Sequence, residues 1–248
     1  MKFKKNKIIV VGTLLISVVF SPSLLSSESS DKNIYLFAIE NEKRTQGDLK
    51  YDEKRKPIDV LPFTQIKRGD QVLELGAGGG YTTELISWVV GKSGRVYAHF
   101  LYNQERLAND RLPNVISLRQ HSLDENRTVL NENKISNLDA IIIFFVLHDI
   151  YLNNEMSEEL LSTLYASLKP GGNLIILDNA AKPDSGLTYI DSLHRIGENF
   201  VKDELIKAGF VFDGSSNILR NIEDDHTKPW GDFEGMQDRF AYRFKKPV

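Results

Sequence analysis

From residue 71 to the end of the chain, apolar runs typical of buried strands alternate with segments of helical periodicity. The strand-like runs are QVLEL (71–75), GRVYAHF (94–100), NVISLR (114–119), LDAIIIFFVL (138–147), NLIILD (173–178), FVFDGSSNIL (210–219) and RFAYRFKK (239–246). Helices are predicted at residues 81–91, 103–110, 157–168 and 192–209. This alternation predicts an α/β fold: a seven-stranded, mostly parallel sheet with a terminal antiparallel hairpin and helices on both faces.

The first thirty residues have a different pattern from the rest of the chain. Four lysines and no acid within residues 1–7 precede an apolar run, residues 8–20, and a small polar tail. This order predicts a secretory signal peptide at residues 1–30, because the run is shorter than the roughly 18 residues of a membrane-spanning helix. The protein is therefore expected to be exported, to a periplasmic or extracellular location. The alternative is an uncleaved N-terminal anchor, which would be its one membrane contact.

The remainder divides into a polar, partly helical segment at residues 31–65 and the main α/β domain at residues 66–248. We expect the first to be a helical cap near the carboxyl end of the sheet. The formal net charge is -3, and the absence of a basic stripe after residue 7 argues against a nucleic-acid partner. The chain has no cysteine, which excludes disulfides and thiol nucleophiles and leaves His and carboxylates as metal ligands.

Four glycines within residues 76–80 join the first strand to the next helix. Glycine adopts positive φ at little cost and has no side chain to obstruct a ligand, so the turn predicts close approach of the backbone to a small molecule. In the dinucleotide fingerprint G-x-G-x-x-G, the third glycine would fall at Tyr81. The acid expected about 20 residues later is missing at the end of the second strand. A nicotinamide dinucleotide is therefore disfavoured.

Four segments together resemble the class I S-adenosylmethionine-dependent methyltransferases. They are VLELGAGGGYTTEL, similar to the first motif of that family, LDAIIIFFVLHDIY, LKPGGNLIILD and LHRIGENFVKDELIKAGF. The resemblance extends over residues 50–248, and it includes a subgroup of predicted bacterial methyltransferases that often carry export signals. It implies a Rossmann-like fold, S-adenosylmethionine as cofactor and transfer of a methyl group to an acceptor, which we expect to be a small molecule.

By this resemblance, the glycine turn surrounds the methionine and ribose parts of the cofactor. The residues expected to bind the cofactor are Glu74, Gly76, Gly78, Gly79, Tyr81, Thr82, His99 and Asp124. Glu74 has an equally weighted alternative, in which it accepts backbone N–H bonds and holds the turn. The threonines at the start of the helix have capping as their alternative role.

One position departs from the family pattern. Most members place an acid at the end of the second strand, where it binds the ribose hydroxyls. VYAHF instead places Phe100 there, with His99 beside it. Another group then binds the ribose, or the cofactor affinity is low, or the site is altered. Together with the export signal, this departure supports an alternative function: an exported binding module on the same fold with catalysis lost or altered.

Candidates for the chemistry follow the fourth and fifth strands, because open α/β sheets bind ligands at the carboxyl ends of their strands. They are His148, Asp149, Asp178, His194 and Arg195. His148 has the side chain of a base at neutral pH, oriented by Asp149; its alternative is a hydrogen-bonded wall residue. We expect His194 or Arg195 to face the site, and the alternative for Arg195 is a surface pair with Glu198. A metal-binding role for His148, Asp149 and Asp178 is the alternative, but no tight ligand-spacing motif is present, so no metal is expected.

Overall fold

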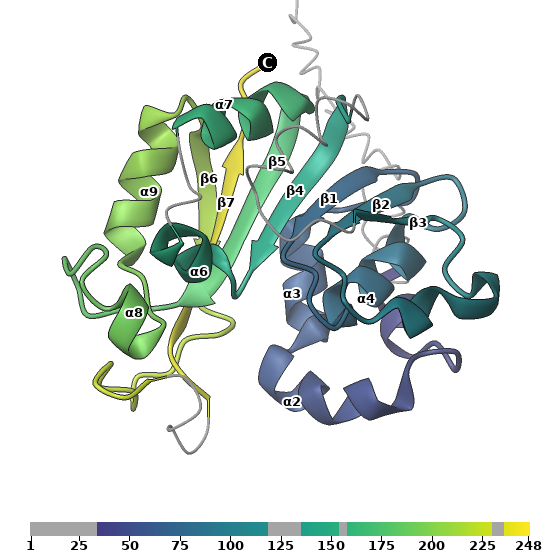
Figure 1. Ribbon diagram of the computed structural model, residues 1–248, viewed down its shortest axis with the longest axis horizontal. Coiled ribbons are helices and arrows are strands. Elements are labelled where there is room, and N and C mark those ends of the chain that lie inside the picture. The colour runs from purple at the N-terminus through teal and green to yellow at the C-terminus, as the bar shows by residue number, and fades with distance from the viewer. Residues whose placement is uncertain (1–33, 119–134, 154–157, 230–235) are drawn as a thin grey trace, which may run out of the picture.

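The computed structural model describes residues 34–118, 135–153, 158–229 and 236–248. Its strands form one seven-stranded sheet in the order β3-β2-β1-β4-β5-β7-β6 (Figure 1). The strands are β1 (Gln71–Leu75), β2 (Arg95–His99), β3 (Val115–Leu118), β4 (Leu138–Phe144), β5 (Leu168–Asn179), β6 (Val211–Ser216) and β7 (Arg239–Lys245). Strands β1 to β5 pair in parallel, whereas β7 is antiparallel to both of its neighbours. The predicted fold class, with its terminal antiparallel hairpin, is confirmed.

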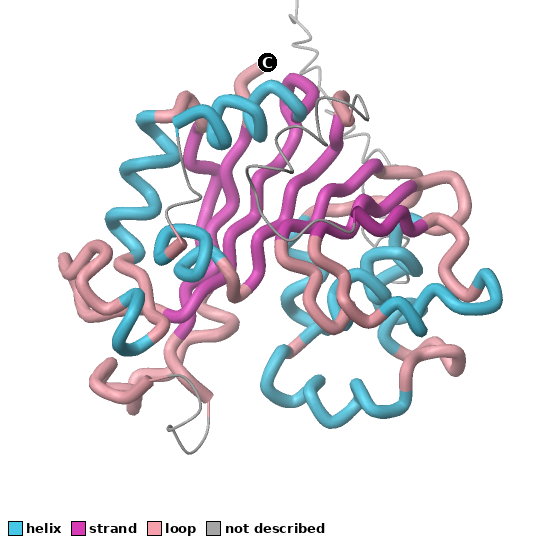
Figure 2. The backbone as a smooth tube through the Cα atoms, viewed as in Figure 1, coloured by secondary structure: helices cyan, strands magenta, loops and turns pink. Residues whose placement is uncertain are grey.

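Helices cover both faces of the sheet (Figures 1 and 2). One face carries α3 (Pro57–Thr64) and α4 (Tyr81–Val90), and the other carries α6 (Leu147–Leu152), α7 (Glu158–Ser167) and α9 (Glu198–Lys207). In α4, every residue except Trp88 is buried. The helix is therefore covered on its outer side as well as on the side that packs against the sheet.

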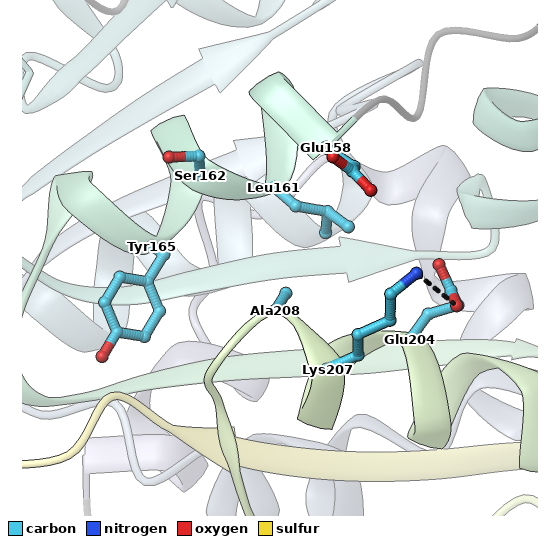
Figure 3. A pocket seen from close by; sticks show the side chains of 7 residues that line it. All are labelled: Glu158, Leu161, Ser162, Tyr165, Glu204, Lys207 and Ala208. Carbon is cyan, nitrogen blue, oxygen red and sulfur yellow. Dashed lines mark ion pairs between the residues drawn. The ribbon is translucent and has the colours of Figure 1, made fainter.

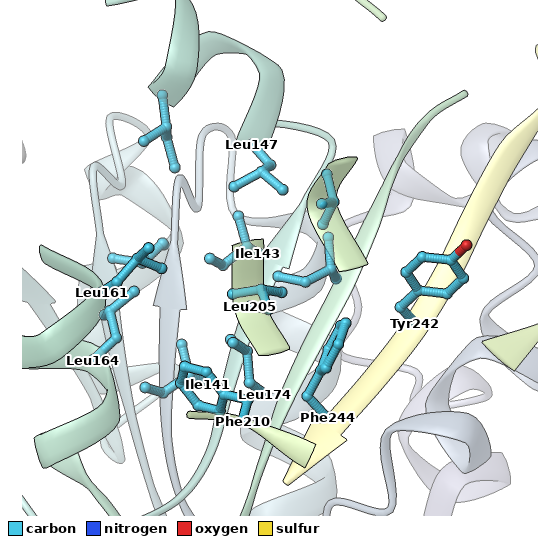
Figure 4. Packing of buried hydrophobic residues seen from close by; sticks show 14 of the residues in the cluster. Ile141, Ile143, Leu147, Leu161, Leu164, Leu174, Leu205, Phe210, Tyr242 and Phe244 are labelled. Carbon is cyan, nitrogen blue, oxygen red and sulfur yellow. The ribbon is translucent and has the colours of Figure 1, made fainter. Parts of the chain in front are cut away.

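Strand β4 shows how the sequence pattern produces these layers. Its residues are buried except Asp139, as expected of a parallel strand covered on both faces. Successive side chains point to opposite faces, so Ile141 and Ile143 pack in the layer with α6, α7 and α9. Ile142 and Phe144 pack in the layer with α3 and α4. Figure 4 shows the first layer, in which side chains from α6, α7 and α9 pack against side chains from β4, β5 and β7.

The segment before the sheet is helical in short pieces. Residues 34–39 form one helical stretch, followed by η1 (Gln46–Tyr51), α2 (Asp52–Arg55) and α3. Lys56 separates α2 from α3 with a left-handed backbone, and Pro57 begins α3, where its missing N–H has no partner to lose. Figure 1 shows α2 beyond the carboxyl ends of β4 and β5.

The prediction of one helix over residues 192–209 is wrong. The segment forms α8 (Ile190–Leu193) and α9, with a break between them. His194 ends α8 in the left-handed region, at φ 52°, and Ile196 forms a parallel bridge with Ala180. A Cβ on Gly197 would lie 2.7 Å from the backbone N of Gly186. Close backbone contact and burial of the segment therefore override its helical periodicity.

Two further elements differ from expectation. Strand β5 begins at Leu168 rather than at the expected residue 173, because Gly171 N–H donates to the Lys246 carbonyl and Gly172 O accepts from Lys246 N–H. The helix expected at residues 103–110 is the 3₁₀ helix η2 (Gln104–Asp110), which is kinked at Ala108 and Asn109. The strand therefore begins before its apolar run, because hydrogen bonds to the C-terminal residues extend it.

The predicted signal peptide, residues 1–30, lies outside the described residues. Among the helices that the structure describes, none is both long and apolar enough to cross a membrane.

Candidate functional site

The strand order reverses between β1 and β4, the point at which open α/β sheets bind ligands. The glycine turn, residues 76–80, follows β1 at this point, and residues 145–149 follow β4. The two segments touch, because a Cβ on Gly76 would lie 2.5 Å from Cγ1 of Val146. Since His148 is two residues beyond Val146, the fold brings the predicted cofactor turn beside the predicted catalytic residue.

The backbone of the turn requires glycine at several positions. The glycines with positive φ are Gly76 (73°), Gly78 (56°) and Gly80 (83°). Gly80 precedes α4, and a Cβ there would lie 2.6 Å from Cδ of Arg106. Because both the sign of φ and the spacing exclude a side chain, the turn places backbone without side chains at the carboxyl edge of the sheet.

Glu74 lies buried on β1 beneath this turn. Its carboxyl group accepts a hydrogen bond from the Thr83 hydroxyl (2.5 Å), on the first turn of α4. Burial raises the pKa of Glu74 to about 7, although the Thr83 hydrogen bond and the charges of Arg55 and Arg106 oppose it. The contact ties the end of β1 to the helix that follows the turn, through a hydroxyl group rather than the backbone N–H groups of the structural alternative.

Tyr81 and Thr82 begin α4, and Tyr81 joins the turn to the N-terminal segment. Its hydroxyl donates to Oδ1 of Asp52 (2.6 Å), and Asp52 also pairs with Arg44 (2.8 Å). Burial and the Asp52 carboxylate raise the pKa of the Tyr81 hydroxyl. Thr82 does not cap the helix, because Gly80 is the N-cap residue and no side chain makes a capping hydrogen bond. Both residues line a crevice between α3 and the sheet.

A buried ion network beside the turn is absent from the sequence predictions. Nη1 of Arg106 lies 2.6 Å from the Glu84 carboxylate and 2.8 Å from that of Asp48. Glu84 also pairs with Arg111, and Nε of Arg106 donates to the Gly79 carbonyl. The network therefore supports the outer side of the turn. No local pattern indicated it, because its members come from three separate segments.

The end of β2 runs alongside the turn. His99 is buried, and Gly78 N–H donates to the Phe100 carbonyl at 3.1 Å. Phe100 has φ 56° and is 38% exposed, so an aromatic face occupies the position where the family has an acid. Tyr102 is 69% exposed, and its hydroxyl oxygen would lie 3.3 Å from a Cβ on Gly79. Tyr102 thus brings a hydroxyl group to the turn, a position that the sequence motifs did not reveal.

His148 and Asp178 form the most constrained pair of the predicted catalytic set. Both are buried, and Nδ1 of His148 lies 2.7 Å from Oδ1 of Asp178, whose other oxygen accepts the His148 backbone N–H at 2.9 Å. Burial lowers the pKa of the imidazole, but the Asp178 and Asp149 carboxylates outweigh this effect and raise it above its ordinary value. Because a carboxylate only accepts, Nδ1 carries a proton and Nε2 is the atom left to act on a ligand.

Asp149 and His194 complete this group from two different helices. Oδ1 of Asp149 lies 3.4 Å from Nε2 of His148 and 3.4 Å from Nδ1 of His194. The two imidazole rings meet edge to face, with centroids 5.5 Å apart. The Asp149 and His194 side chains are 41% and 44% exposed. The sequence predicts that His194 or Arg195 faces the site, and His194 is the residue that lies beside His148.

Arg195 has a different environment from the one expected of a catalytic residue. It is fully buried, and its guanidinium donates to the Ala180 and Lys228 carbonyls (2.9 and 3.0 Å). Nη2 pairs with the buried Asp224 at 2.9 Å. The alternative Arg195–Glu198 surface pair is also wrong, since Glu198 pairs with a different arginine. These contacts make Arg195 an anchor for the loop between β6 and β7.

Two further arginines lie at this edge of the sheet and were not predicted. Arg239 and Arg55 stack on the Phe145 ring, with guanidinium carbons 4.7 and 5.7 Å from its centroid. Within the described residues, neither forms an ion pair with a carboxylate. Burial and the charge of Arg55 lower the pKa of Arg239 to about 10. Both arginines therefore place positive charge beside the residues that follow β4.

A groove lies between α7 and α9 (Figure 3). It is lined by Glu158, Leu161, Ser162, Tyr165, Glu204, Lys207 and Ala208, with a Lys207–Glu204 ion pair at 3.8 Å. Helix α7 ends where β5 begins, and α9 ends before β6 begins. The groove is thus at the amino end of these strands, opposite the glycine turn.

The described residues of the predicted site fall into two adjacent groups. The first surrounds the glycine turn and contains Glu74, Gly76, Gly78, Gly79, Tyr81, Thr82 and His99. The second follows β4 and β5 and contains His148, Asp149, Asp178 and His194. Arg195 belongs to neither group, and Asp124 lies outside the described residues. The fold therefore joins a backbone-lined ligand turn to a cluster of imidazole and carboxylate groups.

Sequence and structure comparisons both lead to methyltransferases. No family model matches the chain. A protein-L-isoaspartate O-methyltransferase of Methanosarcina mazei is 31% identical over 117 residues, 47% of this chain and 44% of that protein. A ubiquinone/menaquinone biosynthesis C-methyltransferase of Hydrogenovibrio crunogenus is 30% identical over 122 residues, 48% of this chain and 46% of that protein. The chain thus spans about half the length of these curated relatives.

The fold is similar to that of a solved SAM-dependent methyltransferase from Aquifex aeolicus. The TM-score is 0.53 at 18% identity, with 92% of this chain and 99% of that chain covered. The likeness therefore extends well beyond the segment shared with the sequence relatives. The resemblance to class I methyltransferases that the motifs indicated is confirmed, both in sequence and in fold.

Proposed function

We propose that the protein is an S-adenosylmethionine-dependent methyltransferase with a small-molecule acceptor. The observation that carries the proposal is the glycine turn, which joins β1 to α4. Its positive-φ backbone lies at the switch point of the sheet, between β1 and β4. In this proposal the turn contacts the methionine and ribose parts of the cofactor. The hydroxyl of Tyr102, beside Gly79, offers the ribose a hydrogen-bonding group in place of the acid that Phe100 replaces.

The reaction is a direct displacement at the methyl carbon. A bond forms between the acceptor nucleophile and this carbon while the carbon–sulfur bond breaks, and the bonding pair stays on sulfur as the neutral thioether of S-adenosylhomocysteine. An acceptor that carries a proton on its nucleophile also loses that proton. Alignment of the two reactants supplies much of the rate enhancement, on the order of 7–11 kcal/mol in well-oriented systems.

His148 and its neighbours lie on the acceptor side in this proposal. The Gly76–Val146 contact places the turn beside residues 145–149, so an acceptor bound there lies next to a cofactor held by the turn. Asp178 fixes the His148 ring, which leaves Nε2 directed to the acceptor side with Asp149 and His194. Arg55 and Arg239 add positive charge at the same edge, which favours an acceptor or cofactor carboxylate.

Calorimetry of the full chain with S-adenosylhomocysteine tests this function. We expect saturable binding at one site per chain and a clear loss of affinity in Gly78→Val, because this residue has φ 56° and faces Tyr102. Gly47→Val is the matched control, since nothing lies within 4 Å of its added Cβ. A wild-type protein that is folded and does not bind S-adenosylhomocysteine would refute the proposal. Once an acceptor is known, His148→Ala should lose transfer and retain cofactor binding.

We also propose that the protein is exported, on the strength of the lysine-rich start and the apolar run at residues 8–20. N-terminal sequencing of the native protein, after separation of cell fractions, tests this. A mature protein that begins near residue 31 outside the cytoplasm is the expected result. An intact N-terminus in the soluble cytoplasmic fraction would contradict it.

A further inference from the structure

We infer that His148, Asp149 and His194 form a binding site for a divalent transition-metal ion. The three residues are the only group of this kind within the described parts of the chain: each offers one ligand atom, and these atoms lie within 4.8 Å of one another. Metal binding itself does not depend on the proposed methyl transfer. The role assigned to the metal, activation of the acceptor, rests on that function.

Two of the three separations between the ligand atoms match those around a metal ion better than a hydrogen bond. Oδ1 of Asp149 lies 3.4 Å from Nε2 of His148 and 3.4 Å from Nδ1 of His194. An N–H···O hydrogen bond is ordinarily about 2.7–3.2 Å long. Two ligands in a tetrahedral site with metal–ligand bonds of about 2.0–2.2 Å lie about 3.4 Å apart. Both contacts therefore have the length of ligand–ligand edges around one ion.

The surroundings of His148 match those of a metal-bound imidazole. Its Nδ1 is 2.7 Å from the fully buried Asp178 carboxylate, which also accepts the backbone N–H groups of His148 and Asn179. Metal-ligating histidines nearly always donate their other ring N–H to such a carboxylate or to a carbonyl, which fixes the tautomer and raises the basicity of the ligand nitrogen. Nε2 of His148 is thereby prepared as a lone-pair donor on the side of Asp149 and His194.

The position of His194 depends on the break between α8 and α9. His194 ends α8 with φ 52°, a backbone conformation uncommon for residues other than glycine. The next residue, Arg195, is held in the interior by Asp224 and two carbonyls. The anchor fixes the turn, so His194 lies against the His148 ring at a centroid distance of 5.5 Å. Arg195 is in this sense a positioning residue for the third ligand.

The site is open to solvent on one side. His148 is buried, whereas the Asp149 and His194 side chains are 41% and 44% exposed. Three protein ligands with an open position are typical of catalytic rather than structural zinc sites. A bound ion would coordinate an oxygen of the acceptor there and lower the pKa of a hydroxyl group. The acceptor is then a small molecule with an oxygen nucleophile.

Titration of the metal-free full chain with Co²⁺ tests the site. We expect one Co²⁺ per chain, with visible absorption bands typical of low-coordinate nitrogen and oxygen ligation, and displacement of Co²⁺ by Zn²⁺. His194→Ala and Asp149→Asn should weaken Co²⁺ binding by at least about 100-fold, and Asp178→Asn by about 10–100-fold. His226→Ala is the matched control: its imidazole pairs with Asp238 at 3.0 Å, and it should bind Co²⁺ as the wild type does.

The outcomes separate the metal site from the proposed function. Absence of Co²⁺ binding in the wild type, or equal affinity in His194→Ala and the wild type, would overturn the metal site. The half-exposed position of His194 means that its variant should stay folded, which circular dichroism and the free energy of unfolding verify. Calorimetry with S-adenosylhomocysteine on the same samples reports on the methyltransferase proposal. A protein that binds S-adenosylhomocysteine but not Co²⁺ refutes only the metal site. A protein that binds Co²⁺ but not S-adenosylhomocysteine refutes only the proposed function.

Discussion

Replacing Gly76 by alanine should destabilise the folded protein by about 2–5 kcal/mol, because the new methyl group meets two independent obstacles. The first is the backbone, since Gly76 has φ 73°. A residue other than glycine in the left-handed region costs about 1–2 kcal/mol. The second is Val146, whose Cγ1, Cγ2 and Cβ atoms would lie 2.5, 2.9 and 3.0 Å from the added carbon. Overpacking of this kind costs about 1–3 kcal/mol.

Equilibrium denaturation in urea measures the total loss of stability. Variants of two other glycines separate the backbone cost from the packing cost. Gly186 has φ 54° with nothing within 4 Å of an added Cβ, so Gly186→Ala should show the backbone cost alone, about 1–2 kcal/mol. Gly47 has no such contact and no left-handed φ, so Gly47→Ala should change stability by less than about 0.5 kcal/mol. Val146→Ala removes most of the obstructing atoms. In that background Gly76→Ala should cost about 1–3 kcal/mol less than in the wild type.

The explanation fails if Gly76→Ala costs no more than Gly186→Ala, or if its cost is the same with and without Val146. Either result would mean that the turn and the segment after β4 are not in the tight contact that the structure shows. The adjacency of the two predicted groups of site residues would then lose its support. The same variant should also bind S-adenosylhomocysteine more weakly than the wild type, because it distorts the turn proposed to hold the cofactor.

Three further predictions concern buried charges. Glu84→Gln removes one of the two buried carboxylates that pair with Arg106 and should cost about 1.5–3 kcal/mol by denaturation, because Asp48 still pairs with Arg106; a cost below about 1 kcal/mol would contradict the network. Arg195→Met leaves the buried Asp224 unpaired, with a similar expected cost, and should raise protease cleavage between β6 and β7. The pKa of Glu74 is raised to about 7, so between about pH 4.5 and 7 the unfolded chain ionises while the folded protein stays protonated. The stability that protonated Glu74 contributes below pH 4.5 is lost as the pH rises through this window. The free energy of unfolding of Glu74→Gln should therefore rise relative to that of the wild type by up to about 3 kcal/mol between pH 4.5 and 8; equal pH profiles would exclude the raised pKa.

The strands and the glycine turn were predictable because their causes are local. A strand covered on both faces must be apolar along its whole length, and LDAIIIFFVL marks β4 for that reason. The predicted and observed limits of the first strand, residues 71 and 75, coincide. A turn with positive φ requires glycine wherever the rest of the chain lies, so residues 76–80 indicated a ligand turn without a structure.

The errors share one physical origin, which is contact between segments distant in sequence. Periodicity predicts one helix over residues 192–209, but Arg195 finds its partners 15 to 33 residues away and breaks the helix to reach them. The Arg106–Glu84 pair has no local signature for the same reason.

The sequence by itself therefore determined the order of the strands and helices, the ligand turn and the chemical types present beside it, since each follows from the backbone and burial requirements of neighbouring residues. Only the tertiary structure decided that Arg195 anchors a loop and that His194 joins His148 and Asp149. His194 lies 46 residues beyond His148, with α7 and β5 between them along the chain. The helices α6 and α8 therefore meet only in the folded protein. The partner of a buried charge, and the third member of a cluster, are properties of packing rather than of spacing along the chain.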